Sequence, residues 1–439
     1  MKNLLIIAYY FPPSGGPGVQ RVLKHIKYLP QFGWNPIIYT VKDAQYPAYD
    51  YSLVDELPTD IMVYRSKIFE PYNFYRKIVG IKNSDPVDVN IIKKVGQKLT
   101  WKEKFSEFIR ATFFIPDARM FWYFSGKKEL KRAIKENKID AVYNSAPPYT
   151  TALIAKKVKK ILNVPWVAGF RDPWSDFIAS PKRWFIPRAI ERHLEKSVYQ
   201  KADKIECAWV GIIKDAMGKF PDLDESKFHY IPNGYDSEDY PKVNWEGNDR
   251  FTLTYTGSMY GKRNPSALFQ AIEKLLKENL IKKEDFVIKF IGRFGREIHE
   301  MIENTSFQES IKVISYLPHK ESLIKLLKSD ALLLIVDESK ESEEIVPGKV
   351  YEYIGTKKPI LTIAPKNGAV AQLMNETGIG LVAHQSEIDE ISDNFLRLFS
   401  LWKNKGEKLK INESAIAKYE RRESTRQLST LLDELAKTH

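Results

Sequence analysis

Two glutamates with seven residues between them, Glu344 and Glu352, are the side chains best placed to bind a ligand. An apolar run predicts a buried strand over residues 331–336, and Pro347 with Gly348 predicts that a helix begins shortly after it. Glu352 would then lie in the first or second turn, where its two carboxylate oxygens can accept hydrogen bonds from the adjacent hydroxyls of a ribose. Free N–H groups at the start of the helix could bind phosphate or sugar oxygens. The alternative is an ordinary glutamate that stabilises the helix dipole.

Two glycine-containing loops could bring backbone N–H groups close to a phosphate. The loop at residues 14–18 follows a predicted strand and precedes a predicted helix, an arrangement that favours an anion. It lacks the G-x-G-x-x-G spacing of dinucleotide-binding loops, which disfavours an NAD-dependent dehydrogenase, and it could also be a plain turn. The second loop runs from Gly257 to Lys262 and Arg263. These two cations could hold a diphosphate through charge-assisted hydrogen bonds, or they could simply face solvent.

The elements that must position these loops form two successive α/β patterns. In the first half, strands are predicted at residues 4–10, 36–41, 139–143, 166–170 and 204–208, with helices at 19–29, 150–162 and 183–201. In the second half, strands are predicted at 252–255, 286–291, 311–314, 331–336 and 360–363, with helices at 266–278, 320–329, 387–402 and 413–436. This repeated alternation of strands and helices predicts an α/β fold of two Rossmann-like domains that face each other across a cleft. In such domains ligands bind outside the carboxyl ends of the parallel strands.

A length of 439 residues also favours two domains. We predict an N-terminal domain over residues 1–240 and a C-terminal domain over residues 250–412, with a final helix within residues 413–439. The polar stretch 235–249 has the composition of an interdomain linker. A long basic and aromatic insertion is predicted at residues 65–135.

The net charge of +12 is concentrated around that insertion. Residues 65–138 contain 18 Lys and Arg against 8 Asp and Glu, together with 13 aromatic residues. This composition suits anionic lipid, and single-stranded nucleic acid as well, although no recognised nucleic-acid module is present. One helical face would carry Trp101, Phe105, Phe108, Ile109 and Phe113. The helix is therefore expected either to lie in a membrane surface or to pack into the core with a basic outer face.

Other features narrow the class of protein. No run of 18 apolar residues exists, so no transmembrane helix is expected, and the apolar N-terminus is interpreted as a strand rather than a signal peptide. The single Cys207 fits a reducing cytoplasm. The seven histidines are scattered, with no pair at metal-ligand spacing, so no metal site and no bound cofactor are expected.

Several motifs occur in an order that resembles the family-4 retaining glycosyltransferases of GT-B fold, of the type that builds bacterial surface polysaccharides. The pair Glu344 and Glu352 resembles their Glu-x7-Glu element. The other matching segments are Tyr10-Phe11-Pro12-Pro13 with Gly15-Gly16, Phe170-Arg171-Asp172-Pro173-Trp174, Ile231-Pro232-Asn233-Gly234-Tyr235-Asp236, Tyr255-Thr256-Gly257-Ser258 and Phe290-Ile291-Gly292. The resemblance covers nearly the full chain apart from the 65–135 insertion. It departs after the first glutamate, where many members have glycines and this chain has Ile345 and Val346.

The resemblance implies a role for each matching residue. Glu352 would bind the donor ribose, and Glu344, with Glu343 as an alternative, would lie near the donor sugar. The remaining donor-binding residues would be Gly15, Gly16, Ser258, Lys262, Arg263, Gly292, Leu317 and Lys349, of which Lys262 and Arg263 hold the diphosphate and Leu317 lies near the base. Arg171 and Asp172 would line the acceptor side, with Asp172 as a base or an acceptor clamp. For Asp172 the alternative is a helix N-cap before Pro173.

The implied activity is metal-independent, retaining transfer of a sugar from a nucleotide diphosphate sugar, with UDP as the default nucleotide. The acceptor would be a polysaccharide or a lipid-linked glycan, at the inner face of the cell membrane. The C-terminal helix would return to the N-terminal domain, and the C-terminal domain would bind the donor. Two alternatives stay open: a nucleotide-sugar epimerase of GT-B fold, for which we can place no extra acid and base groups, and a non-catalytic partner that only binds a nucleotide sugar.

Overall fold

The computed structural model divides the chain into two compact units. Unit 1 comprises Met1–Pro232 and Arg421–His439, and unit 2 comprises Asn233–Glu420. The structure describes residues 1–46, 48–68, 101–177, 180–259, 261, 263–337, 343–344, 346–404 and 407–438. The divisions fall at 232 and 420, whereas the sequence placed them at 240–250 and 413.

Unit 1 is built on a sheet of seven parallel strands in the order β3-β2-β1-β4-β5-β6-β7, as far as its described residues go. The strands are β1 (Lys2–Ala8), β2 (Trp34–Lys42), β3 (Met62–Lys67), β4 (Ala141–Ala146), β5 (Trp166–Phe170), β6 (Lys204–Cys207) and β7 (Phe228–Tyr230). Ile6 of β1 pairs with Ile38 of β2 and with Tyr143 of β4. The central strands are apolar at almost every position because helices cover both faces of the sheet.

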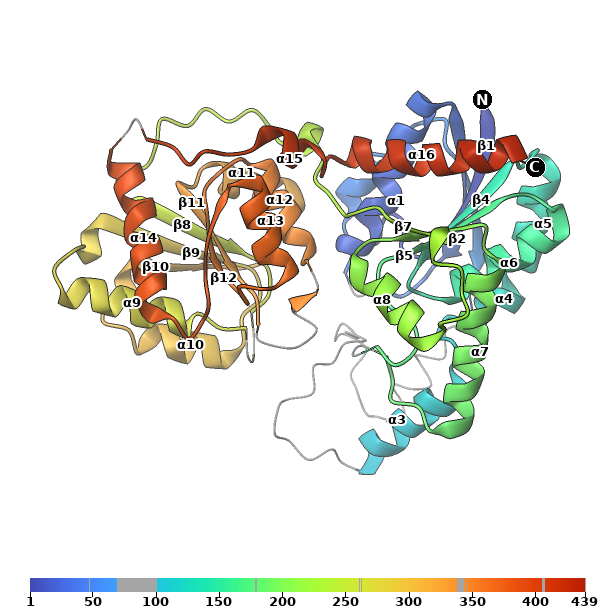
Figure 1. Ribbon diagram of the computed structural model, residues 1–439, viewed down its shortest axis with the longest axis horizontal. Coiled ribbons are helices and arrows are strands. Elements are labelled where there is room, and N and C mark those ends of the chain that lie inside the picture. The colour runs from blue at the N-terminus through green and yellow to red at the C-terminus, as the bar shows by residue number, and fades with distance from the viewer. Residues whose placement is uncertain are drawn as a thin grey trace. The chain divides into compact units, whose positions relative to one another are not determined.

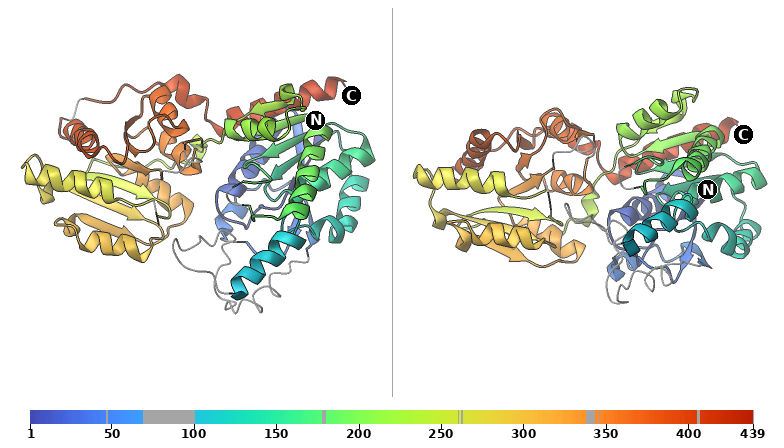
Figure 2. Two further views of the ribbon diagram at one scale, coloured as in Figure 1. Left: turned by 60° about the horizontal axis from the view of Figure 1, so that its bottom comes forward. Right: turned by 90° about the horizontal axis from the view of Figure 1, so that it is seen from below.

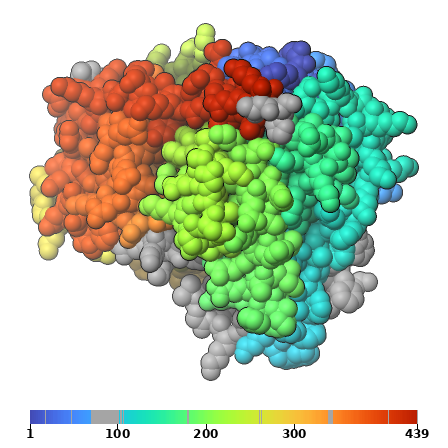
Figure 3. All heavy atoms as spheres, turned by 45° about the vertical axis from the view of Figure 1, so that its right-hand side comes forward, coloured from blue at the N-terminus to red at the C-terminus, as the bar shows by residue number. Residues whose placement is uncertain are grey.

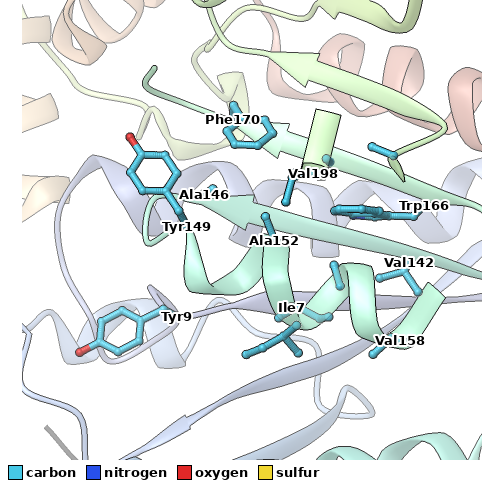
Figure 4. Close-up of a cluster of buried hydrophobic side chains, with 14 of the residues drawn as sticks. Ile7, Tyr9, Val142, Ala146, Tyr149, Ala152, Val158, Trp166, Phe170 and Val198 are labelled. Atoms are coloured by element: carbon cyan, nitrogen blue, oxygen red, sulfur yellow. The ribbon is translucent and has the colours of Figure 1, made fainter. Parts of the chain in front are cut away.

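The helices of unit 1 divide between the two faces of the sheet (Figure 1). They are α1 (Pro17–Tyr28), α3 (Trp101–Phe113), α4 (Trp122–Ser125), α5 (Lys127–Glu136), α6 (Thr150–Leu162), α7 (Phe185–Lys201), α8 (Val210–Lys219) and α16 (Arg421–Thr438). Alternate residues of β1 serve each face. Ile7 belongs to the same buried cluster as residues of α6 and α7, and Figure 4 shows it beside α6, while Ile6 belongs to the cluster that includes residues of α1 and α16. The core therefore has two layers, one on each side of the sheet.

Unit 2 has six parallel strands in the order β10-β9-β8-β11-β12-β13, counted over its described residues. The strands are β8 (Phe251–Thr256), β9 (Phe286–Ile291), β10 (Ile311–Ile314), β11 (Ala331–Ile335), β12 (Ile360–Ile363) and β13 (Gly380–Ala383). The helices are α9 (Ser266–Lys277), α10 (Arg296–Glu303), α11 (His319–Leu327), α12 (Gly348–Gly355), α13 (Ala369–Thr377), α14 (Ile388–Lys403) and α15 (Glu413–Ala417). Figure 2 shows helices on both sides of this sheet. The strand order reverses between β8 and β11, which is where ligands bind in such sheets.

The predicted α/β class with two Rossmann-like domains is confirmed. Two predictions about elements differ from the structure. The stretch 235–249 is part of unit 2 rather than a free linker, because the Tyr240 hydroxyl donates to the Glu352 carbonyl oxygen at 2.7 Å and Tyr235 is buried. The single helix predicted at 413–436 is two helices, α15 and α16.

The described part of the 65–135 insertion is mostly helical. Residues 65–67 belong to β3, residues 69–100 lie outside the described residues, and α3 begins at Trp101. The interpretation of this helix as a core element is wrong, because Trp101, Phe105 and Phe108 are all exposed.

Candidate functional site

The carboxyl ends of β8 and β9 bring two glycines of unit 2 into direct backbone contact. Gly257 follows β8 with φ 111° and donates its N–H to the Ile291 carbonyl at 2.8 Å. Gly292 follows β9 with φ 146°, and a Cβ atom there would clash with the Gly257 carbonyl oxygen. Only glycine satisfies both the backbone angle and the contact at Gly292, so these loops lie close together with no side chain between them.

Lys349 lies beside the Gly257 loop. It is the second residue of α12, and its ammonium donates to the Thr256 carbonyl at 3.1 Å and lies 3.8 Å from the centre of the Tyr255 ring. The helix is held there by Tyr353, whose hydroxyl oxygen accepts the Thr256 N–H at 2.8 Å. Burial lowers the pKa of Lys349 well below its usual value, and the nearby Arg263 lowers it further. An anion at this loop would relieve that repulsion.

Arg263 supplies the second cation of this site. Its guanidinium is 3.4 Å from the Asp337 carboxylate, which follows β11, and among the described residues its buried Nε has no hydrogen-bond partner. A buried donor without an acceptor can gain a hydrogen bond when an anionic oxygen arrives. Lys262, the other predicted diphosphate ligand, lies outside the described residues. Lys349 and Arg263 therefore define the cationic part of the site.

Glu352 lies in the second turn of α12, as predicted, and its carboxylate is 32% exposed. Its Oε1 is 3.1 Å from Nε2 of His319, the first residue of α11. The carboxylate is thus oriented by a neighbour without being locked in a buried ion pair. The carboxylate stays partly exposed, so its position is compatible with the predicted role, which stays a prediction.

The other predicted donor residues are placed around this group. Ser258 is exposed, and its carbonyl accepts the Tyr255 hydroxyl at 2.9 Å. Leu317 is half-buried in the loop between β10 and α11, next to Tyr316, whose exposed ring lies 5.5 Å from the Arg293 guanidinium. Glu344 is exposed, and among the described residues it makes no hydrogen bond or ion pair.

In unit 1, the glycine loop at residues 14–18 is partly occupied by its own contacts. The Gly15 N–H already donates to the Ala48 carbonyl at 2.9 Å, so in this conformation it has no hydrogen left for a phosphate. Gly16 has φ 89° and precedes α1, which begins at Pro17. Of the two predicted glycines, Gly16 is the one whose position at the start of a helix suits an anion.

Arg171 braces the carboxyl ends of the unit 1 strands. Its guanidinium donates to the carbonyl oxygens of Gly18 and Pro147 and lies 5.6 Å from the Tyr10 ring centre. Burial raises the pKa of the adjacent Asp172 carboxyl, and the charge of Arg171 opposes that rise. The N-cap alternative for Asp172 is wrong, because the next described helix, α7, begins at Phe185 after Trp184.

Sequence reasoning did not identify His319 or Asp337. Neither belongs to a motif, and each becomes informative only when the fold places it next to Glu352 or Arg263. Among the described residues there is no cluster of three His, Cys, Asp or Glu that could hold a metal ion. Within the same residues, no helix combines the length and apolar character needed to cross a membrane.

Comparison with known proteins identifies the class. The family model described as "Glycosyl transferases group 1" matches residues 236–415, and the one described as "Glycosyltransferase Family 4" matches residues 99–239. The chain therefore belongs to the family-4 type of glycosyltransferases with the GT-B fold.

Individual relatives agree with that assignment. The chain is 23% identical over 259 residues to the probable glycosyltransferase WbjE of Pseudomonas aeruginosa, a match that covers 55% of this chain and 61% of WbjE. It resembles the structure of a glycosyltransferase from Rickettsia africae with a TM-score of 0.63 and 16% identity over 100% of both chains. It also resembles Anabaena HepE in complex with UDP, with a TM-score of 0.59 and 11% identity over 99% of this chain and 100% of HepE. At such identities these structures show the fold alone.

Proposed function

We propose that the chain transfers a sugar from a nucleotide diphosphate sugar, which it binds at the carboxyl end of the unit 2 sheet. The observation that carries the proposal is the geometry of α12. This helix places Lys349 against the Gly257 loop and Glu352 one turn further on, so one ligand can span both with a diphosphate and a ribose. Arg263 would complete the diphosphate site, together with Lys262.

UDP is the nucleotide that we favour. HepE, which shares the fold, is described in complexes with UDP and with UDP-glucose. In our proposal the ribose hydroxyls donate to Glu352, and the base lies near Leu317 and Tyr316, whose exposed ring offers a surface for stacking. The donor sugar would lie toward Glu344.

The transfer would retain the anomeric configuration. The bond between the anomeric carbon and the diphosphate oxygen breaks, and the acceptor oxygen bonds to that carbon on the same face. The acceptor proton passes to the departing diphosphate, so no protein nucleophile is required. Lys349 and Arg263 would stabilise the charge that develops on the leaving group, without a metal ion. Asp172, whose carboxyl is buried beside Arg171 and has a pKa raised by that burial, is the proposed acceptor clamp or base.

The acceptor that we propose is a polysaccharide or a lipid-linked glycan at the inner face of the cell membrane. A further structure of the same fold is described as a lipopolysaccharide outer core galactosyltransferase, WaaB. The basic surplus of residues 65–138 favours an anionic surface as the place of action.

Calorimetric titration with UDP and with 2′-deoxy-UDP tests the donor site. We expect Glu352→Ala to weaken UDP binding by at least about tenfold, because a charged acceptor of two hydrogen bonds is lost, and to remove the preference for UDP over its deoxy analogue. Glu303→Ala, at an exposed position of α10, serves as the matched control. Unchanged UDP binding in Glu352→Ala would refute the assignment.

Product analysis separates the three candidate functions. Incubation with UDP-sugars should release free sugar slowly and, with a suitable acceptor, yield a glycoside that keeps the donor's anomeric configuration by nuclear magnetic resonance. Conversion of the donor into its epimer would instead identify an epimerase, and tight UDP-sugar binding without any turnover would identify a binding partner. Full activity in a chelator would support metal-independent transfer.

A further inference from the structure

Many of the exposed large apolar side chains of unit 1 gather on two helices that lie beside each other. Eight such side chains, each exposed by 44% to 82%, belong to α3 and to the start of α7: Trp101, Phe105, Phe108, Phe113, Trp184, Phe185, Ile186 and Ile190. We call this set the α3–α7 apolar surface. Figure 3 shows the outer side of α7, in green, next to that of α3, in cyan. Apolar patches of this kind on a folded chain mark sites of interaction.

A buried arginine holds the two helices in register. Arg183 forms a 2.8 Å ion pair with Glu191 and donates to the carbonyl oxygens of Ala111, Phe114 and Pro116. The Arg183 side chain is only 2% exposed, so this connection is part of the fold. The α3–α7 apolar surface is therefore a built feature rather than the frayed end of a helix.

A second contact makes the surface continuous. The Trp184 indole donates to the Thr112 hydroxyl at 2.9 Å. Thr112 lies four residues after Phe108 and seven after Phe105, so it shares their face of α3. The aromatic stripe of α3 is thus connected through Thr112 and Trp184 to the start of α7.

The charges around this surface favour one kind of partner. Lys104 on α3 and Lys182, in the segment just before α7, are exposed, and residues 65–138 of the sequence contain 18 Lys and Arg against 8 Asp and Glu. A second copy of the chain would present the same surplus of positive charge, which disfavours a symmetric dimer through this surface. An anionic lipid surface offers phosphate groups for the lysines and an acyl boundary for Trp and Phe side chains.

We infer that the α3–α7 apolar surface docks unit 1 onto an anionic membrane, with its aromatic side chains entering the headgroup region. The inference goes beyond a basic insertion, because half of its anchors, from Trp184 to Ile190, lie outside residues 65–135. The purpose of the docking, which is to reach a lipid-linked acceptor, rests on the proposed function. The docking itself does not depend on that function.

Co-sedimentation of the full-length protein with lipid vesicles tests the inference. We expect binding to vesicles that contain phosphatidylglycerol and weaker binding to phosphatidylcholine vesicles, and high salt should reduce the binding to the anionic vesicles to about the phosphatidylcholine level. Phe185→Ser with Ile186→Ser should weaken binding by at least about tenfold, because two side chains that bury apolar area are removed. Lys104→Glu with Lys182→Glu should weaken binding only to the anionic vesicles.

Ile161→Ser, which removes an exposed apolar side chain from α6 on another part of unit 1, is the matched control and should bind like the original protein. Equal melting temperatures would show that the variants fold. Anionic vesicles that bind the Phe185→Ser, Ile186→Ser variant as well as the original protein would overturn the inference. So would a homodimer in vesicle-free solution that this variant converts to monomer, because the surface would then be a contact between copies.

Donor hydrolysis in vesicle-free solution keeps the two proposals apart. The surface variants should hydrolyse a UDP-sugar at the original rate, and Glu352→Ala should bind vesicles normally. Vesicle binding without any donor turnover would support the membrane docking and refute the proposed glycosyl transfer. Donor turnover without vesicle binding would support the enzyme activity and refute the docking.

Discussion

At the scale of single residues, the contact between His319 and Glu352 has the clearest functional consequence. The 3.1 Å distance lets the imidazole orient the carboxylate that is proposed to bind ribose. Replacing His319 by Ala removes one hydrogen bond to a charged group, so UDP affinity should fall by about three- to tenfold. Calorimetry would measure this, with His299→Ala on exposed α10 as the control. His319→Asn should recover part of the loss, and equal affinity in all variants would mean that Glu352 needs no support.

Lys349 gives the binding of UDP a dependence on pH. Its pKa in the free protein is lowered well below the usual value by burial and by Arg263, and a bound diphosphate would raise it. Binding should therefore take up a proton at pH values between the two pKa values, and affinity should fall as the pH rises through that range. Titrations in two buffers of different ionisation enthalpy measure the proton uptake. Lys349→Arg should abolish it, since arginine stays charged; uptake that persists in this variant would assign the proton to another group.

At the scale of elements, Gly292 determines how the β8 and β9 loops meet. An alanine there would place its methyl group against the Gly257 carbonyl, and its backbone would have to adopt a φ of 146°. Gly292→Ala should lower the free energy of unfolding of unit 2 by about 1–3 kcal/mol and weaken UDP binding. Gly218→Ala is the contrasting control, because that glycine lies inside α8 with open space around it and an alanine should be neutral or stabilising. Chemical denaturation would compare the free energies of unfolding of the two variants. If Gly292→Ala were as stable as the original protein, position 292 would not require glycine.

Elements with continuous apolar runs or clear periodicity were predictable from the sequence. Helix α6 and strands β5, β9, β10 and β12 have the predicted bounds. Short edge strands were not predicted: β7 has three residues and β13 has four, too few to show a pattern. Tertiary contacts explain the break between α15 and α16, where the Tyr419 carbonyl accepts the Tyr235 N–H at 2.9 Å instead of continuing a helix.

The candidate site was predictable to the extent that it follows motifs. The position of Glu352 in an early helical turn came from Pro347 and the spacing. The partnership with His319 could not be foreseen, because the two residues are 33 positions apart and meet only through the packing of α11 and α12. The exposure of α3 was equally hidden, since an amphipathic stripe looks the same whether it faces a core or a lipid surface.

At the scale of the whole molecule, the C-terminal residues of the chain complete the unit that the first residues begin. Helix α16 joins unit 1, where Leu428 and Leu432 are fully buried in the same core layer as Val22 and Ile26 of α1. Its polar side is tied in as well, since the Thr425 hydroxyl is 2.9 Å from Nδ1 of His25. The core of unit 1 therefore includes residues that are separated along the chain by the whole of unit 2.

That arrangement makes the stability of unit 1 sensitive to acid. Burial, together with the charges of Arg21 and Arg421, lowers the pKa of His25 well below the usual value. The unfolded chain takes up a proton at this histidine below about pH 6.5, whereas the folded chain resists it, so the free energy of unfolding should fall as the pH decreases through that value. His25→Gln, which keeps a polar partner for Thr425 but cannot titrate, should flatten this dependence in denaturation experiments between neutral and mildly acidic pH. The exposed His193 of α7 offers the control, because His193→Gln should leave the slope as it was. If His25→Gln retained the full acid sensitivity, a titrating group other than His25 would be responsible, and the α1–α16 contact would not be its source.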